Sequence, residues 1–304
     1  MSQDIDGEHS KPRHGCGIMG VCFWPWSKPE EPEEERTANP VPAAACHTRH
    51  KSQIVKTLPV VTPLTPAPHN MVRFVCMSDT HNGTKKLPHP VPDGDVLLHA
   101  GDFTQRGTIA EARQFNDWLG TLPHPHKVVI SGNHEVLLDQ VACYTHKAAD
   151  PLTVLRNATY LQDSSVTIYG IKIYGAPWTP EYHVMAFNLP RGKSLQHKWQ
   201  IIPTDTDILM THEPPLGHGD LTWREQRVGC VDLLAAVQTR IKPAYHVFGH
   251  IHEGYGMTTD GTTVFVNAST CDVTYEPVNP PVVFDMPLPE GYTKLRRDSV
   301  SSAT

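Results

Sequence analysis

Two short motifs in this sequence each contain a pair of residues, two positions apart, whose side chains can bind metal ions. Asp79 and His81 follow an apolar run, and Gly249-His250-Ile251-His252 follows another. In an extended chain, residues i and i+2 point to the same side, so the two members of each pair can face one site. Because Asp-x-His also occurs by chance in many chains, the motifs carry weight only if related residues recur elsewhere.

Residues of the same kind do recur, each time directly after an apolar run. The full set is Asp79 with His81, Asp102 after Gly101, Asn133 and His134 after Gly132, His212, and His250 with His252. Each residue alone is more often a turn former or a structural histidine. Together they form a mixed nitrogen and oxygen donor set without cysteine, unlike structural zinc sites or oxygen-only calcium and magnesium sites. The set predicts a site for two divalent transition metals with one bridging carboxylate.

The apolar runs that precede these residues are predicted β-strands of an α/β fold, in which ligands bind beyond the carboxyl ends of the strands. The predicted strands are Val72–Ser78, Asp95–Ala100, Lys127–Ser131, Tyr160–Leu161, Val166–Tyr169, Ile171–Tyr174, Asp207–Thr211, Tyr245–Phe248, Thr263–Asn267 and Val282–Asp285. Gly170 between two of them indicates a hairpin.

Two segments carry the pattern of helices. Thr108–Gly120 begins with a capping box formed by Thr108 and Glu111, and its apolar residues lie on one stripe. Val231–Ile241 has the same periodicity and ends before a proline. A weaker pattern predicts a helix over Leu138–Ala149. Phe187–Trp199 has no strong period and is predicted to be a surface excursion.

Composition divides the 304 residues into three parts. Residues 1–70 are rich in proline and glutamate and are predicted to be a disordered leader without a fold before about residue 71. Residues 71–290 form one predicted domain, and residues 291–304 a flexible tail. The seven cysteines lack regular spacing and no secretory signal is visible, which favours reduced thiols and a cytoplasmic location.

The charge and hydropathy of the chain exclude two classes of function. A net charge of −6 gives no basic footprint and argues against dedicated nucleic-acid binding. No segment approaches the ~20 apolar residues of a membrane helix, so no transmembrane segment is expected. A protein partner could bind the leader, while the oligomeric state is left open.

The ordered motifs Asp-x-His, Gly-Asp, Gly-Asn-His-Glu, a later His and Gly-His-x-His resemble the calcineurin-like metallophosphoesterase superfamily over residues 72 to about 286. Several further stretches resemble the metallophosphoesterase-domain-containing (MPPED) group, which is similar to class III cyclic nucleotide phosphodiesterases. They are Phe115-Asn116-Asp117-Trp118-Leu119-Gly120, Tyr174-Gly175-Ala176-Pro177-Trp178-Thr179-Pro180, Asn188-Leu189-Pro190-Arg191-Gly192 and His252-Glu253-Gly254-Tyr255-Gly256.

The resemblance implies a four-layer α/β/β/α sandwich with two mixed β-sheets, and a role for each motif residue. Asp79, His81 and His252 would bind one metal ion. Asn133, His212 and His250 would bind the other, with Asp102 bridging the two. His134 would contact the substrate phosphate rather than a metal. Two departures from the family pattern stand out: Glu135 replaces an aspartate that orients the histidine, and Glu213 replaces a small residue and could repel an anionic substrate.

The expected activity is hydrolysis of small phosphodiesters, with cyclic nucleotides as candidate substrates. Two metal ions would activate a bridging hydroxide for in-line attack, and His134 would protonate or stabilise the leaving oxygen. Mn²⁺ is the favoured ion, with Fe, Zn²⁺ and Co²⁺ as alternatives. Asn133 and His134 would also contact the substrate, and Arg191, Trp178 and Tyr255 are candidates for lining a nucleotide pocket.

Two alternative functions are also consistent with the sequence. The first is a nucleotide-binding or scaffold protein with the same fold and low turnover, an interpretation motivated by Glu135, Glu213 and the leader. The second is a protein phosphatase or nuclease of the same superfamily, although the acidic balance of charge disfavours a nuclease.

Overall fold

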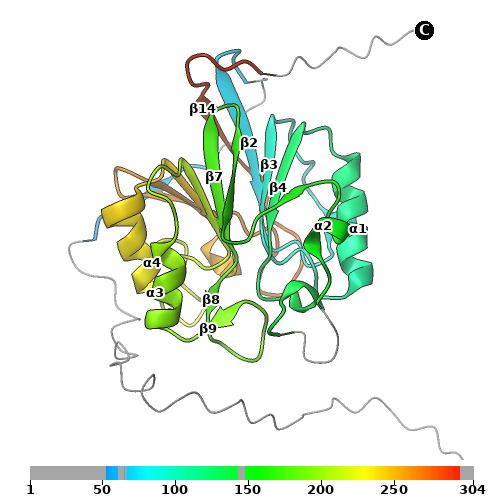
Figure 1. The fold of residues 1–304 in the computed structure, drawn as a ribbon, viewed down its shortest axis with the longest axis vertical. Coiled ribbons are helices and arrows are strands. Elements are labelled where there is room, and N and C mark those ends of the chain that lie inside the picture. The colour runs from blue at the N-terminus through cyan, green and yellow to red at the C-terminus, as the bar shows by residue number, and fades with distance from the viewer. Residues whose placement is uncertain (1–52, 61–64, 66, 143–147, 295–304) are drawn as a thin grey trace, which may run out of the picture. The chain divides into compact units, whose positions relative to one another are not determined.

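Two mixed β-sheets lie face to face, and helices cover their outer sides (Figure 1). This arrangement is seen in a computed structural model that describes residues 53–60, 65, 67–142 and 148–294. The predicted layers of helix, sheet, sheet and helix are confirmed, and both sheets combine parallel with antiparallel pairs.

The smaller sheet has five strands, and its middle strands are parallel. Their order is β14 (Val282–Pro287), β2 (Met71–Met77), β3 (Val96–Ala100), β4 (His126–Ile130) and β5 (Thr159–Tyr160). Only β14 runs antiparallel to its neighbour. The motif residues after β2, β3 and β4 therefore emerge at the same edge of the sheet.

The larger sheet has seven strands. Their order is β1 (Lys56–Leu58), β12 (Gly256–Thr259), β13 (Val264–Asn267), β11 (Tyr245–Phe248), β10 (Ile208–Thr211), β7 (Ile171–Ala176) and β6 (Ser164–Ile168). Strands β13, β11, β10 and β7 are parallel, so His212 after β10 and His250 after β11 again share one edge. A separate pair joins β8 (Thr179–Pro180) to β9 (Asn188–Leu189).

Three apolar clusters hold the layers together. The first lies between the sheets and includes Phe74 and Leu98 from one sheet and Ile173 and Met210 from the other. Each sheet therefore buries both of its faces, which explains why its strands read as nearly continuous apolar runs in the sequence. The second cluster packs α1 (Ile109–Thr121) on the smaller sheet, and the third packs α3 (Lys193–Gln200) and α4 (Val231–Ala236) on the larger one.

The helices are short. They are α1, α2 (Pro151–Val154), α3 (Lys193–Gln200) and α4 (Val231–Ala236), which continues as a π-helical turn over Val237–Ile241; single 3-10 turns cover Thr84–Lys86, Val136–Leu138 and His252–Gly254. The predicted capping box of α1 is present, with the Thr108 side chain accepting from Glu111 N–H. None of the helices in the described part of the chain has the length and apolar character needed to cross a membrane.

The prediction that no fold begins before residue 71 is wrong for β1. Lys56–Leu58 pairs antiparallel with β12, and Gln53 donates a side-chain hydrogen bond to the carbonyl of Leu216 at 2.8 Å. Strand formers in the leader satisfy the open edge of β12, a long-range effect that the proline-rich composition around them obscures. The rest of the predicted disorder concerns mainly residues 1–52, which lie outside the described residues.

Two other element predictions need correction. The described part of Leu138–Ala149 is not an α-helix, because Asp139 turns the chain by accepting hydrogen bonds from Val141 N–H and Phe187 N–H; residues 143–147 of that prediction lie outside the described residues. Phe187–Trp199 is not a surface excursion, since it contains β9 and most of α3. Leu195 and Trp199 of α3 are buried against the larger sheet.

Residues 291–294, the described part of the predicted flexible tail, are held in place by contacts with the domain. Lys294 forms an ion pair with Asp95 at 2.8 Å, and Tyr292 packs at the hairpin residue Gly170. These two contacts hold residues 291–294 against the domain. Residues 295–304 lie outside the described residues.

Candidate metal centre and active site

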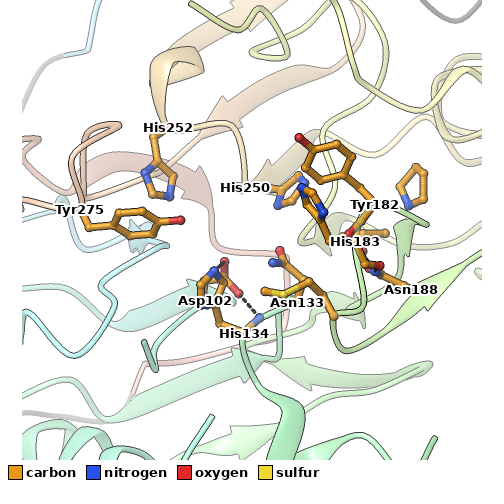
Figure 2. A pocket seen from close by; sticks show the side chains of 12 residues that line it. Asp102, Asn133, His134, Tyr182, His183, Asn188, His250, His252 and Tyr275 are labelled. Carbon is orange, nitrogen blue, oxygen red and sulfur yellow. Dashed lines mark hydrogen bonds and ion pairs between the residues drawn. The ribbon is translucent and has the colours of Figure 1, made fainter. Parts of the chain in front are cut away.

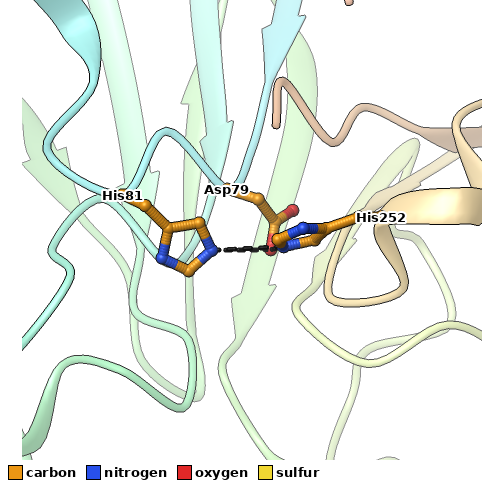
Figure 3. A group of neighbouring side chains, drawn as sticks. All are labelled: Asp79, His81 and His252. Atoms are coloured by element: carbon orange, nitrogen blue, oxygen red, sulfur yellow. Dashed lines mark hydrogen bonds and ion pairs between the residues drawn. The ribbon is translucent and has the colours of Figure 1, made fainter. Parts of the chain in front are cut away.

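Asp79, His81 and His252 form the first cluster of candidate ligands (Figure 3). The Nε2 atoms of the two histidines lie 3.2 Å apart, and His252 Nε2 is 3.4 Å from Asp79 Oδ1. Asp79 is itself fixed by the hydroxyl of Ser269, which donates to Oδ2 at 2.9 Å. The structure therefore brings the first motif, Asp79 and His81, together with His252 of the last motif, as the sequence predicted.

A second cluster contains Asp102, His212 and His250, with Asn133 beside it. His212 Nε2 lies 3.2 Å from Asp102 Oδ2 and 3.0 Å from Asn133 Oδ1. Asp102 Oδ2 is also 3.8 Å from His81 Nε2, which belongs to the first cluster. The Asp102 carboxylate thus lies between the two clusters.

Hydrogen bonds to backbone carbonyls fix the rings of three candidate ligands. The Nδ1 atoms of His81, His212 and His252 contact the carbonyl oxygens of Thr104, Ala100 and Asp272 at 3.2, 2.8 and 2.7 Å. A carbonyl only accepts, so each Nδ1 carries a proton and Nε2 is the ring atom that faces the other candidate ligands. This is the way in which proteins orient histidines for metal ions.

The backbone around the candidate ligands is strained. Asp79, His81, Asp102 and His250 have φ angles of 51°, 39°, 53° and 68°, in the left-handed region that side-chain-bearing residues seldom adopt. Such conformations typically cost about 1–3 kcal/mol each and concentrate at functional sites. The strain directs these side chains into a common space.

Crowding at Gly132 also marks a packed ligand shell. A Cβ atom on Gly132 would lie 2.7 Å from His212 Nε2 and closer still to Asp102 Oδ1. A Cβ atom on Gly249 would collide with the Asp79 carboxylate. Glycine at these two turns therefore permits the close approach of donor atoms, as the sequence predicted.

Burial and neighbouring charges shift the pKa values of the ligands in opposite directions. Burial lowers the pKa of His81 to about 4 and that of His250 to about 3. Burial also disfavours the charged forms of His212 and His252, but the carboxylates of Asp102 and Asp79 outweigh it and raise their pKa values to about 10 and about 9. The same histidines hold the pKa values of both carboxyl groups below their usual range despite burial.

This donor set fits divalent transition metals. Imidazole nitrogens and carboxylate oxygens from each group of three residues lie within 4.8 Å of one another. Among the described residues, histidines are the groups that offset the charge of the buried Asp79 and Asp102 carboxylates, and cations would offset it directly. Of the residues assigned to metals in the sequence, Asp79, His81, Asp102, Asn133, His212, His250 and His252 all lie at this one place.

His134 is next to the ligands without belonging to either predicted shell. Its Nδ1 donates to the carbonyl of Gln105 at 2.8 Å, and its backbone N–H donates to Asp102 Oδ1 at 2.8 Å. The ring faces a cavity of about 380 Å³ (Figure 2), and Nε2 lies 4.0 Å from Asp102 Oδ2. Nε2 is therefore the ring atom available to exchange a proton with a ligand in the cavity.

Glu135 does not orient the His134 ring in this chain. Its carboxylate instead accepts from the N–H groups of Asp102, Gly132 and Thr104, at 2.9, 2.6 and 2.9 Å, and from the Thr104 hydroxyl at 2.7 Å. The longer side chain thus joins the turn after β3 to the turn after β4. The ring is positioned by the Gln105 carbonyl.

Glu213 is buried, with 2% of its surface exposed, and does not line the cavity. Burial raises the pKa of its carboxyl group to about 8. Its Oε2 lies 4.0 Å from His250 Nε2. The carboxyl group therefore lies beside a candidate ligand and does not present a negative charge to a substrate.

The cavity beside His134 is lined in part by residues to which the sequence assigned no role in the site, although Thr179, Pro180 and Asn188 lie in stretches that carry the family resemblance. They come from the ligand turns, from the segment between β8 and β9, and from the turn after β13; examples are Tyr182, His183, Asn188 and Tyr275 (Figure 2). Loop residues of this kind lack a periodic pattern. A weak signal for Tyr275 exists in Asp272-Val273-Thr274, a turn sequence directly before it.

Three residues predicted to bind the substrate do not line this cavity. Arg191 donates to the carbonyl of Val228 at 2.8 Å, and Tyr255 donates its hydroxyl to the carbonyl of Pro280 at 2.8 Å. Trp178 donates to Asp163 at 2.7 Å and lies under the Lys198 ammonium. Each is engaged in packing or hydrogen bonding within the fold.

A four-layer α/β/β/α sandwich with histidine and carboxylate ligands at its strand ends defines a metallophosphoesterase. The chain belongs to the calcineurin-like phosphoesterase family, whose model matches residues 72–254. The family membership supports a hydrolase that acts on phosphoric esters and binds divalent metal.

Within this family, the chain is related to metallophosphoesterase domain-containing proteins. It is 46% identical to metallophosphoesterase domain-containing protein 1 of Homo sapiens over 280 residues, 84% of this chain and 85% of that protein. A UPF0046 protein of Caenorhabditis elegans is 46% identical over 245 residues, 76% of this chain and 86% of the relative. One solved structure has a TM-score of 0.50 at 14% identity, covering 72% of this chain and 100% of that one, and supports the fold alone.

Proposed function

We propose that this chain is a binuclear metal-dependent phosphodiesterase that hydrolyses small phosphodiesters, with cyclic nucleotides as candidate substrates. The observation that carries the proposal is the position of Asp102 between two ligand clusters. Its Oδ2 lies 3.2 Å from His212 Nε2 and 3.8 Å from His81 Nε2. Asp102 at this position would serve ions held by either cluster, which supports a paired site over a single one.

The ligand roles follow from the two clusters. Asp79, His81 and His252 would hold the first ion. Asn133, His212 and His250 would hold the second, with Asp102 shared. Mn²⁺ is the proposed ion, since imidazole together with carboxylate and amide oxygens accepts it and the family resemblance favours it, while Fe, Zn²⁺ and Co²⁺ suit the same donors.

When bound, the two ions supply Lewis-acid charge that activates water and offsets the negative charge of the phosphate. The protein's own contribution comes from the residues around them. Asn133 has its side-chain oxygen directed to His212, while its amide nitrogen remains able to donate to a phosphoryl oxygen. His134 keeps one proton on Nδ1 for Gln105 and can deliver a second from Nε2 to the leaving oxygen.

The cavity lining favours a diester over a monoester. Among the described residues, no lysine or arginine lines the cavity that contains His134. A phosphodiester carries one negative charge and needs less compensation than a doubly charged monoester. The same cavity has aromatic side chains, Tyr182 and Tyr275, suited to contact a nucleoside.

The alternative function, a binding or scaffold protein with low turnover, loses two of its three motivations. Glu135 and Glu213 are both buried, and neither places a carboxylate in the cavity. The third motivation, the leader, lies mostly outside the described residues. The complete ligand arrangement favours the enzyme.

The proposal is tested by Mn²⁺-dependent hydrolysis of an aryl phosphodiester and of cyclic AMP, paired with metal analysis of the purified protein. We expect Asp102→Asn and His250→Ala to abolish most of the activity. Asp117→Asn and His197→Ala, exposed substitutions of the same types on α1 and α3, serve as controls and should retain it. Activity that survives the first two substitutions unchanged would refute the proposed site.

A further inference from the structure

We infer that Tyr275 is a further catalytic residue, whose hydroxyl donates a hydrogen bond to a phosphoryl oxygen of the bound ester. The inference rests on the proposed function, because it uses the same cavity and the same ligand clusters. It adds a tyrosine that is not part of any of the metal-binding motifs.

Tyr275 stands directly over the candidate metal ligands. Its ring centre is 4.8 Å from that of His81 and 5.4 Å from that of His252, both in edge-to-face contacts, and 6.1 Å from that of His134. Figure 2 shows the hydroxyl pointing into the cavity, on the side opposite His250. A phosphate held by the two clusters would therefore lie within the space that this hydroxyl faces.

The hydroxyl of Tyr275 has no hydrogen-bond partner among the described residues. Other tyrosines near the core differ in this respect: Tyr160 bonds with Ser131 at 2.9 Å, and Tyr255 with Pro280 at 2.8 Å. Tyr275 is 45% exposed and lines the cavity. A tyrosine hydroxyl carries one O–H that can donate a hydrogen bond, so this group is a free donor facing the cavity.

The turn that carries Tyr275 is fixed to the ligand cluster. Asp272 accepts from the N–H and hydroxyl of Thr274 through Oδ1, at 2.8 and 2.7 Å, and from Tyr275 N–H through its carbonyl at 3.0 Å. The same carbonyl receives Nδ1 of His252. Cys271 N–H donates to the carbonyl of Asp79 at 3.2 Å. One turn thus positions a ligand histidine and the tyrosine together.

The backbone of Tyr275 has a φ of 63°, a left-handed conformation that an aromatic residue rarely adopts. The surrounding hydrogen bonds hold it there, and the result is that the ring faces the cavity. Because Tyr169 and Phe187 have similar φ angles elsewhere in the chain, the conformation explains the direction of the Tyr275 ring and is not itself evidence of its role.

Phosphoester hydrolysis in this cavity would benefit from a hydrogen-bond donor to the phosphoryl oxygens. Negative charge on the phosphoryl oxygens must be offset as the ester is attacked, and no lysine or arginine of the described chain lines the cavity. His134 is assigned to the leaving oxygen. Tyr275, which lies closer to His81 and His252 than to His134, is placed to contact a phosphoryl oxygen that does not leave.

The test is Tyr275→Phe, which keeps the ring contacts and removes the hydroxyl. kcat/KM would be measured with bis(p-nitrophenyl) phosphate, which has a good leaving group, and with cyclic AMP, whose leaving group is an alkoxide. We expect a loss of about 10- to 100-fold with both substrates, as for one hydrogen bond to a charged group. Mn²⁺ content and the thermal unfolding midpoint should remain those of the wild type.

The matched control is Tyr292→Phe, a half-exposed tyrosine outside the cavity, which should leave kcat/KM unchanged. A Tyr275→Phe enzyme within twofold of the wild type would overturn the inference. So would a loss confined to cyclic AMP, which would place the hydroxyl at the leaving oxygen, or a loss that tracks Mn²⁺ content, which would make the role structural.

Failure of the proposed function is distinguishable from failure of this inference. A wild-type enzyme that hydrolyses only p-nitrophenyl phosphate contradicts the diesterase proposal. In that case, the same loss in Tyr275→Phe with this monoester still supports the hydroxyl contact.

Discussion

Substituting alanine for Gly132 tests how tightly the ligand shell is packed. The backbone of Gly132 is outside the left-handed region, so alanine adds only steric demand. The new Cβ would lie 2.6 Å from His212 Cε1 and 2.7 Å from Nε2, where ordinary contacts begin at 3.4 Å. His212 must therefore retreat by about 0.7 Å or more. The Asp102 carboxylate, which is closer still, must move as well.

Neither side chain can retreat freely. His212 donates through Nδ1 to the carbonyl of Ala100 at 2.8 Å, and Asp102 accepts the backbone N–H of His134 at 2.8 Å. Overpacking of this kind costs about 1–3 kcal/mol. Weakening one buried hydrogen bond adds about 1 kcal/mol. The free energy of unfolding of Gly132→Ala should thus fall by about 2–4 kcal/mol, and its Mn²⁺ affinity by about 10- to 100-fold, as when other residues that position metal ligands are changed.

Urea unfolding in the presence of a chelator measures the stability effect, and calorimetric titration with Mn²⁺ measures the affinity. Gly120→Ala is the control, because its Cβ meets only the amide end of the exposed Asn157, 2.8 Å away, and moving that amide weakens one exposed hydrogen bond, from Nδ2 to the Asn116 carbonyl. It should change stability by no more than about 1 kcal/mol. The reasoning fails if Gly132→Ala unfolds within 0.5 kcal/mol of the wild type and binds Mn²⁺ equally well.

Four further outcomes are expected. His134→Ala should lower kcat by about 10²- to 10⁴-fold with normal Mn²⁺ content, since it removes a proton donor and no ligand, and loss of the metal would contradict this. Deleting residues 1–60 should destabilise the fold by about 1–2 kcal/mol in urea unfolding, because it exposes the edge of β12, whereas deleting residues 1–52 should not. His212 and His252 have raised pKa values, so their contribution to the stability of the metal-free protein is complete below pH about 6.5 and is lost as the pH rises through 9 to 10. At pH 7.5 both histidines are protonated without metal, so Mn²⁺ binding should release about two protons. Calorimetry in buffers of different ionisation heat measures this release. A release near zero would count against the ligand assignment.

The candidate ligands could be predicted because their signal is local. Each follows a buried strand whose apolar run is visible in the sequence, and parallel strands bring their carboxyl ends to one edge. Asp79 and His252 thus meet although 173 positions separate them. The fold class could be predicted for the same reason, since strands covered on both faces leave a clear apolar pattern.

Other parts of the structure depend on contacts that leave no local pattern. Strand β1 exists because Lys56–Leu58 pairs with Met257–Thr259 across about two hundred residues. Helix α3 begins at Lys193, after a glycine that offers no side-chain cap, and buries only Leu195 and Trp199, too few for a recognisable period. The turn that places Tyr275 uses a left-handed backbone conformation, which residue types alone do not specify.

The two ligand clusters draw their residues from both β-sheets. Asp79, His81 and Asp102 follow strands of the five-stranded sheet, whereas His212 and His252 follow strands of the seven-stranded sheet. Each proposed ion would therefore cross-link the two halves of the sandwich at one end of the interface between them. Ion occupancy would then govern how readily the sheets separate, so that a cell's supply of the metal would set the lifetime of the folded protein as well as its turnover.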